Sequence, residues 1–174
     1  PYCKVNLFFT CYIVYVRMYL YKNKFVTLIF LSFCFQSICN AELIKPKNSI
    51  KPLEVVEIQL NGLKNNNVPY EDFGIEQTWE FAHPNNKKFT GPLEKFKNMI
   101  KGKDYAMLLN HKEHKITEVF SSDNIFTFEV TILDKGKEYF RFKWQVEKFN
   151  KDGPLKDCWL TTAVSSPVSM GSSI

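Results

Sequence analysis

Residues 70–114, with the sequence YEDFGIEQTWEFAHPNNKKFTGPLEKFKNMIKGKDYAMLLNHKEH, decide how the rest of the chain is interpreted. Apolar side chains three and four positions apart predict a helix over about residues 75–82, which His83-Pro84 ends. Residues 85–90 are expected to form a loop. Gly91-Pro92 then predicts a second helix, because proline suits the first helical position and the lysines that close the segment suit a helix end.

A further helix is predicted before this stretch and an antiparallel sheet after it. The first helix has Ser49 as a candidate N-cap and an apolar face made by Leu53, Val56, Leu60 and Leu63. After residue 111 the apolar period becomes two, which predicts strands over about 115–120, 126–132, 140–146 and 158–164. Helices followed by antiparallel strands are typical of an α+β domain. Four strands cannot close a barrel, so we expect N-terminal helices packed on a curved sheet with a concave side, a usual place for a pocket.

The first part of the chain has the pattern of a secretory signal peptide. Read from Met18, residues 18–41 contain two lysines, an apolar run over 25–35, and the small residues Cys39 and Ala41 at a cleavage site. Residues 1–17 do not begin with methionine, and we expect them to lie outside the mature protein, as upstream sequence or an incomplete gene model. The leader predicts a secreted protein, or a plastid protein imported through a bipartite signal, that meets a membrane only if the leader stays uncleaved.

The remainder divides into a linker over 42–50, an α+β domain over 51–165 and a flexible tail over 166–174. Charge separates the leader from this remainder. Four of the 23 basic residues lie in the first 41 positions, which leaves 19 basic against 18 acidic residues. A nearly neutral domain lacks the basic surface of a nucleic-acid-binding protein. Cys158 is its single cysteine, so an internal disulfide and a paired-cysteine metal site are both excluded, and a buried thiol is expected.

Several segments resemble the DUF4864 family, which is defined as a domain of unknown function. The resemblance covers about residues 52–165 and rests on Gln59–Leu63, Phe81–Asn86, Thr90–Phe96, Tyr105–His111 and Cys158–Thr161. It departs from the family pattern at Asp157, where glycine is common. The resemblance implies a cystatin-like or NTF2-like fold, and a chloroplast location is usual for plant members. It implies no activity.

Titratable residues offer only weak catalytic candidates. Glu71, Asp72 and His83 surround the helix over 75–82, and an inward carboxylate there would suit a pocket enzyme of isomerase or dehydratase type. The alternative is that these groups cap helix ends or face solvent. His111 and His114 are three apart near a strand, which predicts opposite faces and therefore no shared metal ion. We expect no metal and no cofactor.

Aromatic residues favour a binding module instead. We expect an apolar pocket whose wall is formed by Trp79, Phe81, Tyr105, Trp144 and Trp159. An aromatic stripe in the strands is interpreted first as hydrophobic core beneath the helices and alternatively as part of this pocket wall; it consists of Phe126, Phe128, Phe140, Phe142, Trp144 and Trp159. The leading hypothesis is a non-enzymatic module for a small apolar ligand or a protein partner. A pocket enzyme and a dimerising structural module, in which the open sheet face forms a homodimer, remain alternatives.

Overall fold

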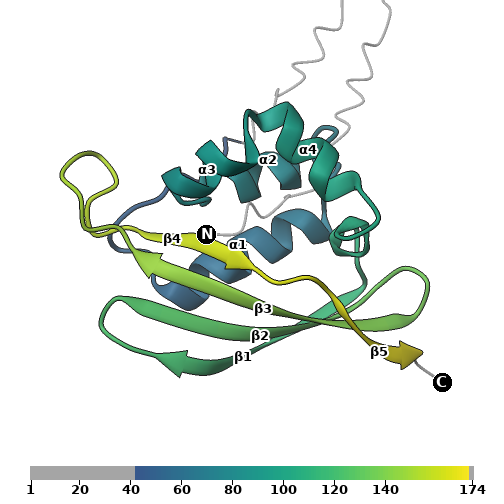
Figure 1. The fold of residues 1–174 in the computed structure, drawn as a ribbon. Coiled ribbons are helices and arrows are strands. Elements are labelled where there is room, and N and C mark those ends of the chain that lie inside the picture. The colour runs from purple at the N-terminus through teal and green to yellow at the C-terminus, as the bar shows by residue number, and fades with distance from the viewer. Residues whose placement is uncertain (1–41, 173–174) are drawn as a thin grey trace, which may run out of the picture. The chain divides into compact units, whose positions relative to one another are not determined.

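The computed structural model describes residues 42–172 of the 174-residue chain (Figure 1). The predicted signal peptide and the segment 1–17 lie outside the described residues. The helices are α1 (Pro52–Lys64), α2 (Phe73–Glu80), α3 (Pro84–Thr90), α4 (Leu93–Lys101) and the 3₁₀ turn η1 (Ala106–Leu108). The strands are β1 (Glu113–Ser121), β2 (Ile125–Leu133), β3 (Glu138–Lys148), β4 (Trp159–Val164) and β5 (Val168–Ser172).

The strands form one antiparallel sheet, in which β1, β2, β3 and β4 are neighbours in that order. β2 and β3 pair from Ile125 opposite Glu147 to Leu133 opposite Tyr139. The helices lie over one face of this sheet (Figure 1). The predicted α+β class, with helices preceding an open antiparallel sheet, is therefore confirmed. This arrangement is compatible with the cystatin/NTF2-like shape that the resemblance implies.

The C-terminal segment differs from its prediction as a flexible tail over 166–174. Val168–Ser172 forms a fifth strand, β5, which pairs with the beginning of β3. All five β5 side chains are exposed. The strand buries no residue against the core, so backbone pairing with β3 places it.

Helix α1 packs its apolar face directly on the sheet. Its fully buried apolar side chains are Val55, Val56, Leu60 and Leu63. They share one core with the inward side chains of β2 and β3, namely Phe128, Val130, Ile132, Phe142, Trp144 and Val146. The apolar face predicted for α1 included Leu53, but Leu53 is 43% exposed and Val55 is buried instead. Ser49 is not the N-cap, because α1 begins after Lys51, whose backbone N–H donates to the Glu54 carboxylate at 2.7 Å.

Helices α1 and α2 approach each other at backbone distance. Gly62 on α1 lies against Gly74 on α2, and a Cβ added to Gly74 would overlap the carbonyl group of Gly62. Only glycine permits this approach. The contact fixes α2 against α1.

None of the helices within residues 42–172 is long and apolar enough to cross a membrane.

The predicted loop over 85–90 is wrong, since these residues belong to helix α3. His83-Pro84 ends α2 and also starts α3, because Pro84 occupies the first helical position and His83 Nδ1 accepts the backbone N–H of Asn85 at 3.1 Å. No α3 side chain is buried. The helix therefore lacks the apolar periodicity by which a sequence reveals one.

Candidate ligand-binding cavity

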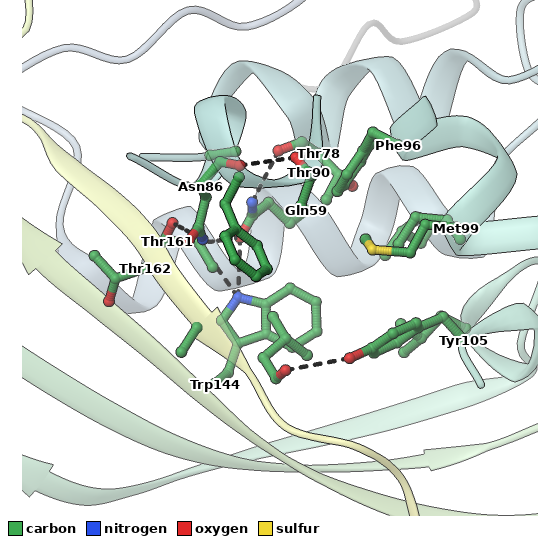
Figure 2. Close-up of a pocket in the computed structure, with 17 residues that line it drawn as sticks. Gln59, Thr78, Asn86, Thr90, Phe96, Met99, Tyr105, Trp144, Thr161 and Thr162 are labelled. Atoms are coloured by element: carbon green, nitrogen blue, oxygen red, sulfur yellow. Dashed lines mark hydrogen bonds between the residues drawn. The ribbon is translucent and has the colours of Figure 1, made fainter. Parts of the chain in front are cut away.

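A cavity of about 280 Å³ lies between helices α3 and α4 and the end of the sheet formed by β3 and β4 (Figure 2). It is lined by Gln59, Leu63, Thr78, Ala82, Asn86, Phe89, Thr90, Phe96, Met99, Ile100, Tyr105, Leu108, Trp144, Thr161, Thr162, Ala163 and Val164. These residues come from four helices, η1 and two strands. Segments far apart in the sequence therefore build a single site.

The cavity exists because the helices above it contribute few inward side chains. Helix α3 buries none, and α4 buries only Phe96 and Ile100. Backbone bonds position α3 instead, since Thr161 of β4 donates its N–H to the Phe81 carbonyl at 2.8 Å and accepts from the His83 N–H at 2.9 Å. A helix placed by hydrogen bonds, without an apolar face to fill the space beneath it, leaves a void.

A buried hydrogen-bond cluster closes the floor of the cavity. The Gln59 Oε1 atom accepts from the Thr161 hydroxyl at 2.6 Å and from the Trp144 indole N–H at 3.0 Å (Figure 2). The Gln59 amide nitrogen donates to the Thr78 carbonyl at 3.0 Å. Gln59, Trp144 and Thr161 are each at most 4% exposed, and Thr78 is 5% exposed. Because these buried groups satisfy one another, a ligand is not required to complete them.

Polar groups on the walls are also bonded to the protein backbone. Asn86 Nδ2 donates to the Thr161 carbonyl at 3.1 Å, and the Thr90 hydroxyl donates to the Asn86 carbonyl at 2.8 Å. The Tyr105 hydroxyl lies 3.4 Å from the carbonyl of Val164. Burial, with the nearby Asp104 carboxylate, raises the pKa of Tyr105, so its phenol stays protonated at neutral pH. The Asn86 side-chain oxygen accepts no hydrogen bond within residues 42–172, so it is a candidate acceptor for a ligand.

The lining carries no Asp, Glu, His, Lys or Arg side chain. A charged ligand would lose its hydration here without finding an opposite charge, which costs several kcal/mol (about 3 or more). The site is therefore suited to a neutral molecule that is mostly apolar.

Two of the five predicted wall residues, Tyr105 and Trp144, line the cavity. The other three lie elsewhere. Trp79 packs on Phe96 at a ring distance of 5.0 Å, and Phe81 is fully buried in the core. Trp159 stacks edge-on against Phe126, with ring centroids 5.1 Å apart.

The sequence did not single out the polar floor. Gln59 and Thr161 are 102 positions apart, and Gln59 falls off the apolar face that predicts α1. A polar residue beside an apolar one, as at Gln59 and Leu60, is too common in a sequence to identify a site.

The weak catalytic candidates do not line the cavity. Glu71 is exposed and lies 3.8 Å from the Lys101 amine. Asp72 precedes α2 with a left-handed backbone, φ 67°, and binds the same Lys101 amine at 2.8 Å. His83 caps α3 and packs on Phe149, and burial lowers its pKa despite the opposing effect of the Glu147 carboxylate. The His83 side chain therefore caps a helix, whereas Asp72 occupies the N-cap position of α2 without a side-chain hydrogen bond to that helix.

The predicted separation of His111 and His114 is wrong. The Nε2 atom of His111 lies 2.8 Å from Nδ1 of His114, and His111 Nδ1 donates to the Leu108 carbonyl at 2.7 Å. His111 precedes β1, and Asn110 has a positive φ of 53°, so strand periodicity does not apply there. Within residues 42–172, no group of three or more His, Cys, Asp or Glu side chains could hold a metal ion. Cys158 is buried, as expected, and burial raises its pKa.

Comparisons with models of protein families, with curated proteins and with solved structures found no match to this chain. The DUF4864 resemblance accordingly stays a prediction, and the functional argument rests on the residues of the cavity.

Proposed function

We propose that this domain is a non-enzymatic binding module that holds a small, neutral, apolar ligand in the cavity beneath α3 and α4. The observation that carries the proposal is a cavity of about 280 Å³ whose lining has no charged side chain. Ligand sites combine a mostly apolar wall with a few polar groups that orient the ligand. Here the acceptor oxygen of Asn86 and the phenol of Tyr105 have that role.

The volume limits the size of the ligand. A dry apolar cavity of about 150 Å³ binds benzene, with its six carbon atoms. By proportion, a cavity of about 280 Å³ holds on the order of ten non-hydrogen atoms. The proposed ligand class is therefore a bicyclic or short-chain molecule, bearing at most one hydrogen-bond donor for Asn86.

Native mass spectrometry of the purified protein tests the proposal first. We expect a second species, heavier than the apoprotein by the mass of a small neutral molecule, that is lost on denaturation. The same protein is then titrated with naphthol, a neutral fluorophore of the stated size whose hydroxyl can donate to Asn86. Its emission should shift as it leaves water.

Two matched variants decide whether naphthol occupies this cavity. Ala163 is exposed on β4 and lines the cavity, so Ala163→Trp should fill the space and weaken naphthol binding by about tenfold or more. Thr117 is exposed on β1 and does not line the cavity, so Thr117→Trp should leave the affinity unchanged. Equal affinities of the two variants, or no naphthol binding by the unmodified protein, would refute the proposal.

A further inference from the structure

The mouth of the cavity carries an unusually exposed aromatic side chain. Phe89 lines the cavity and is 93% exposed, more than any other large apolar residue among those described. Met99 of α4 also lines the cavity and is 37% exposed. Phe89 and Met99 extend the apolar lining of the cavity onto the surface, and apolar patches that adjoin a cavity are sites of contact with ligands, proteins or membranes.

Positive charge is concentrated on the same two helices. Residues 84–103 contain six lysines and one acidic residue, whereas the chain from residue 42 onward is nearly neutral. Lys97 and Lys101 are used in ion pairs with Glu76 and Asp72, at 3.0 and 2.8 Å. Lys87 lies over the Trp79 ring at 5.4 Å.

The other three lysines, Lys88, Lys95 and Lys103, are exposed and form no salt bridge within the described part of the chain. Lys88 precedes Phe89. Lys95 folds over the turn between α3 and α4, since a Cβ on Gly91 would meet its Cδ atom at 2.7 Å. Three unpaired cations therefore lie on, or directly after, the two helices that bear Phe89 and Met99.

We propose that Phe89 and Met99, with Lys88, Lys95 and Lys103, dock the cavity mouth onto an anionic lipid surface, from which the apolar ligand enters. The proposal rests on the proposed function, because a ligand retained by an uncharged apolar cavity dissolves preferentially in a bilayer. It also adds a membrane contact that the sequence analysis assigned only to an uncleaved leader.

The composition of the mouth favours a lipid surface over an acidic protein. Lysine is depleted in the buried centres of protein interfaces, where a larger apolar area excludes water. Surfaces that bind bilayers combine an inserted aromatic ring with flexible lysines that reach the headgroups. An exposed phenylalanine and an exposed methionine on two lysine-rich helices have the second pattern.

Vesicle flotation tests the docking. The protein is mixed with vesicles of phosphatidylcholine alone or of phosphatidylcholine with phosphatidylglycerol. We expect binding to the anionic vesicles, weakened by salt, and little binding to the neutral ones. Phe89→Ala should reduce the bound fraction, whereas Phe120→Ala, which removes another exposed phenylalanine on β1, should not.

A triple variant, Lys88→Glu with Lys95→Glu and Lys103→Glu, separates docking from ligand binding, because none of these residues lines the cavity. It should lose vesicle affinity by about fivefold or more for each lysine and still bind naphthol. Naphthol binding by the unmodified protein without vesicle binding would overturn the docking proposal alone. Vesicle binding without naphthol binding would instead overturn the proposed function.

Two other results would contradict docking onto an anionic lipid surface. Equal binding to neutral and anionic vesicles would show that the lysines do not contribute to docking. Binding to immobilised polyglutamate with no binding to either vesicle would identify an acidic protein as the partner.

Discussion

Helices α1 and α3 lie over the same face of the sheet, but α1 buries five side chains and α3 buries none (Figure 1). The sequence of α1 supplies valines and leucines at helical spacing. The sequence of α3, PNNKKFT, has Phe89 as its only large apolar residue, and this side chain is at the cavity mouth. Helix α1 is therefore held by side-chain packing, whereas α3 is held by backbone hydrogen bonds of the segment that precedes it.

This difference divides the helical layer into a packed half and an incompletely packed half. Where α1 meets the sheet, apolar side chains fill the interface and α2 is fixed against α1 by a glycine contact. Backbone bonds from Thr161 to Phe81 and His83 hold the segment that leads into α3, and a cavity remains beneath α3 and α4. A well-packed half supports the geometry of an incompletely packed half, which is available for a ligand.

Truncating one residue in each half should show the largest contrast. Leu60→Ala, in the packed half, should lower the free energy of unfolding by about 2–5 kcal/mol. The Leu60 side chain is fully buried, so its truncation leaves a cavity in the core. Met99→Ala, at the cavity mouth, should cost less than about 1 kcal/mol, since Met99 already borders empty space. Urea denaturation measures both. Similar losses would show that α4 is packed as tightly as α1.

The histidine pair tests the border between the two halves. His111 is 2% exposed and binds the carbonyl of Leu108, which lines the cavity. Burial lowers the pKa of His111 from 6.5 to about 4, with the His114 ring and the Lys64 amine of α1 adding to the effect. The residue opposite His114 on β2 is the uncharged Ile132.

Because the folded-state pKa is depressed, the unfolded chain binds more protons between about pH 4 and 6.5. The stabilisation is complete above the unfolded pKa and is lost as the pH falls through the folded one. It amounts to about 3 kcal/mol across this window. Urea denaturation as a function of pH should show this slope, and His111→Gln should flatten it. A retained slope in that variant would assign the titration to other groups, of which His114 and His83 also have pKa values lowered by burial.

Two glycines sharpen the comparison at smaller scale. Gly74→Ala should destabilise the protein by about 1–3 kcal/mol, because the new methyl group overlaps the Gly62 carbonyl and forces α1 and α2 apart. Gly62→Ala should be tolerated or slightly stabilising, since its Cβ would meet Gln77 and Gly74 atoms at 3.4 Å and alanine favours a helix. Thermal unfolding of the two variants gives the comparison. Equal behaviour would indicate that the α1–α2 contact is not at backbone distance.

The sequence predicted elements well where a local pattern matched its environment. Alternation over β2 and β3 corresponds to inward residues from Phe128 to Val146, and proline with lysine marked the ends of α4 closely. It failed at α3 and β5, because neither buries a side chain and each is placed by backbone bonds to a distant strand. It also failed at His111, where one positive-φ residue changed the expected direction of the side chain.

Of the five predicted wall residues, only Tyr105 and Trp144 line the cavity, and the reason is general. The amino-acid sequence by itself determined the α+β class, the apolar face of α1 and the neutrality of the domain, since each follows from local periodicity or composition. Only the tertiary structure decided where the cavity lies and that Gln59, Trp144 and Thr161 meet at its floor. A cavity is a difference between the space that distant elements enclose and the side chains that fill it, and no local segment of sequence contains that difference.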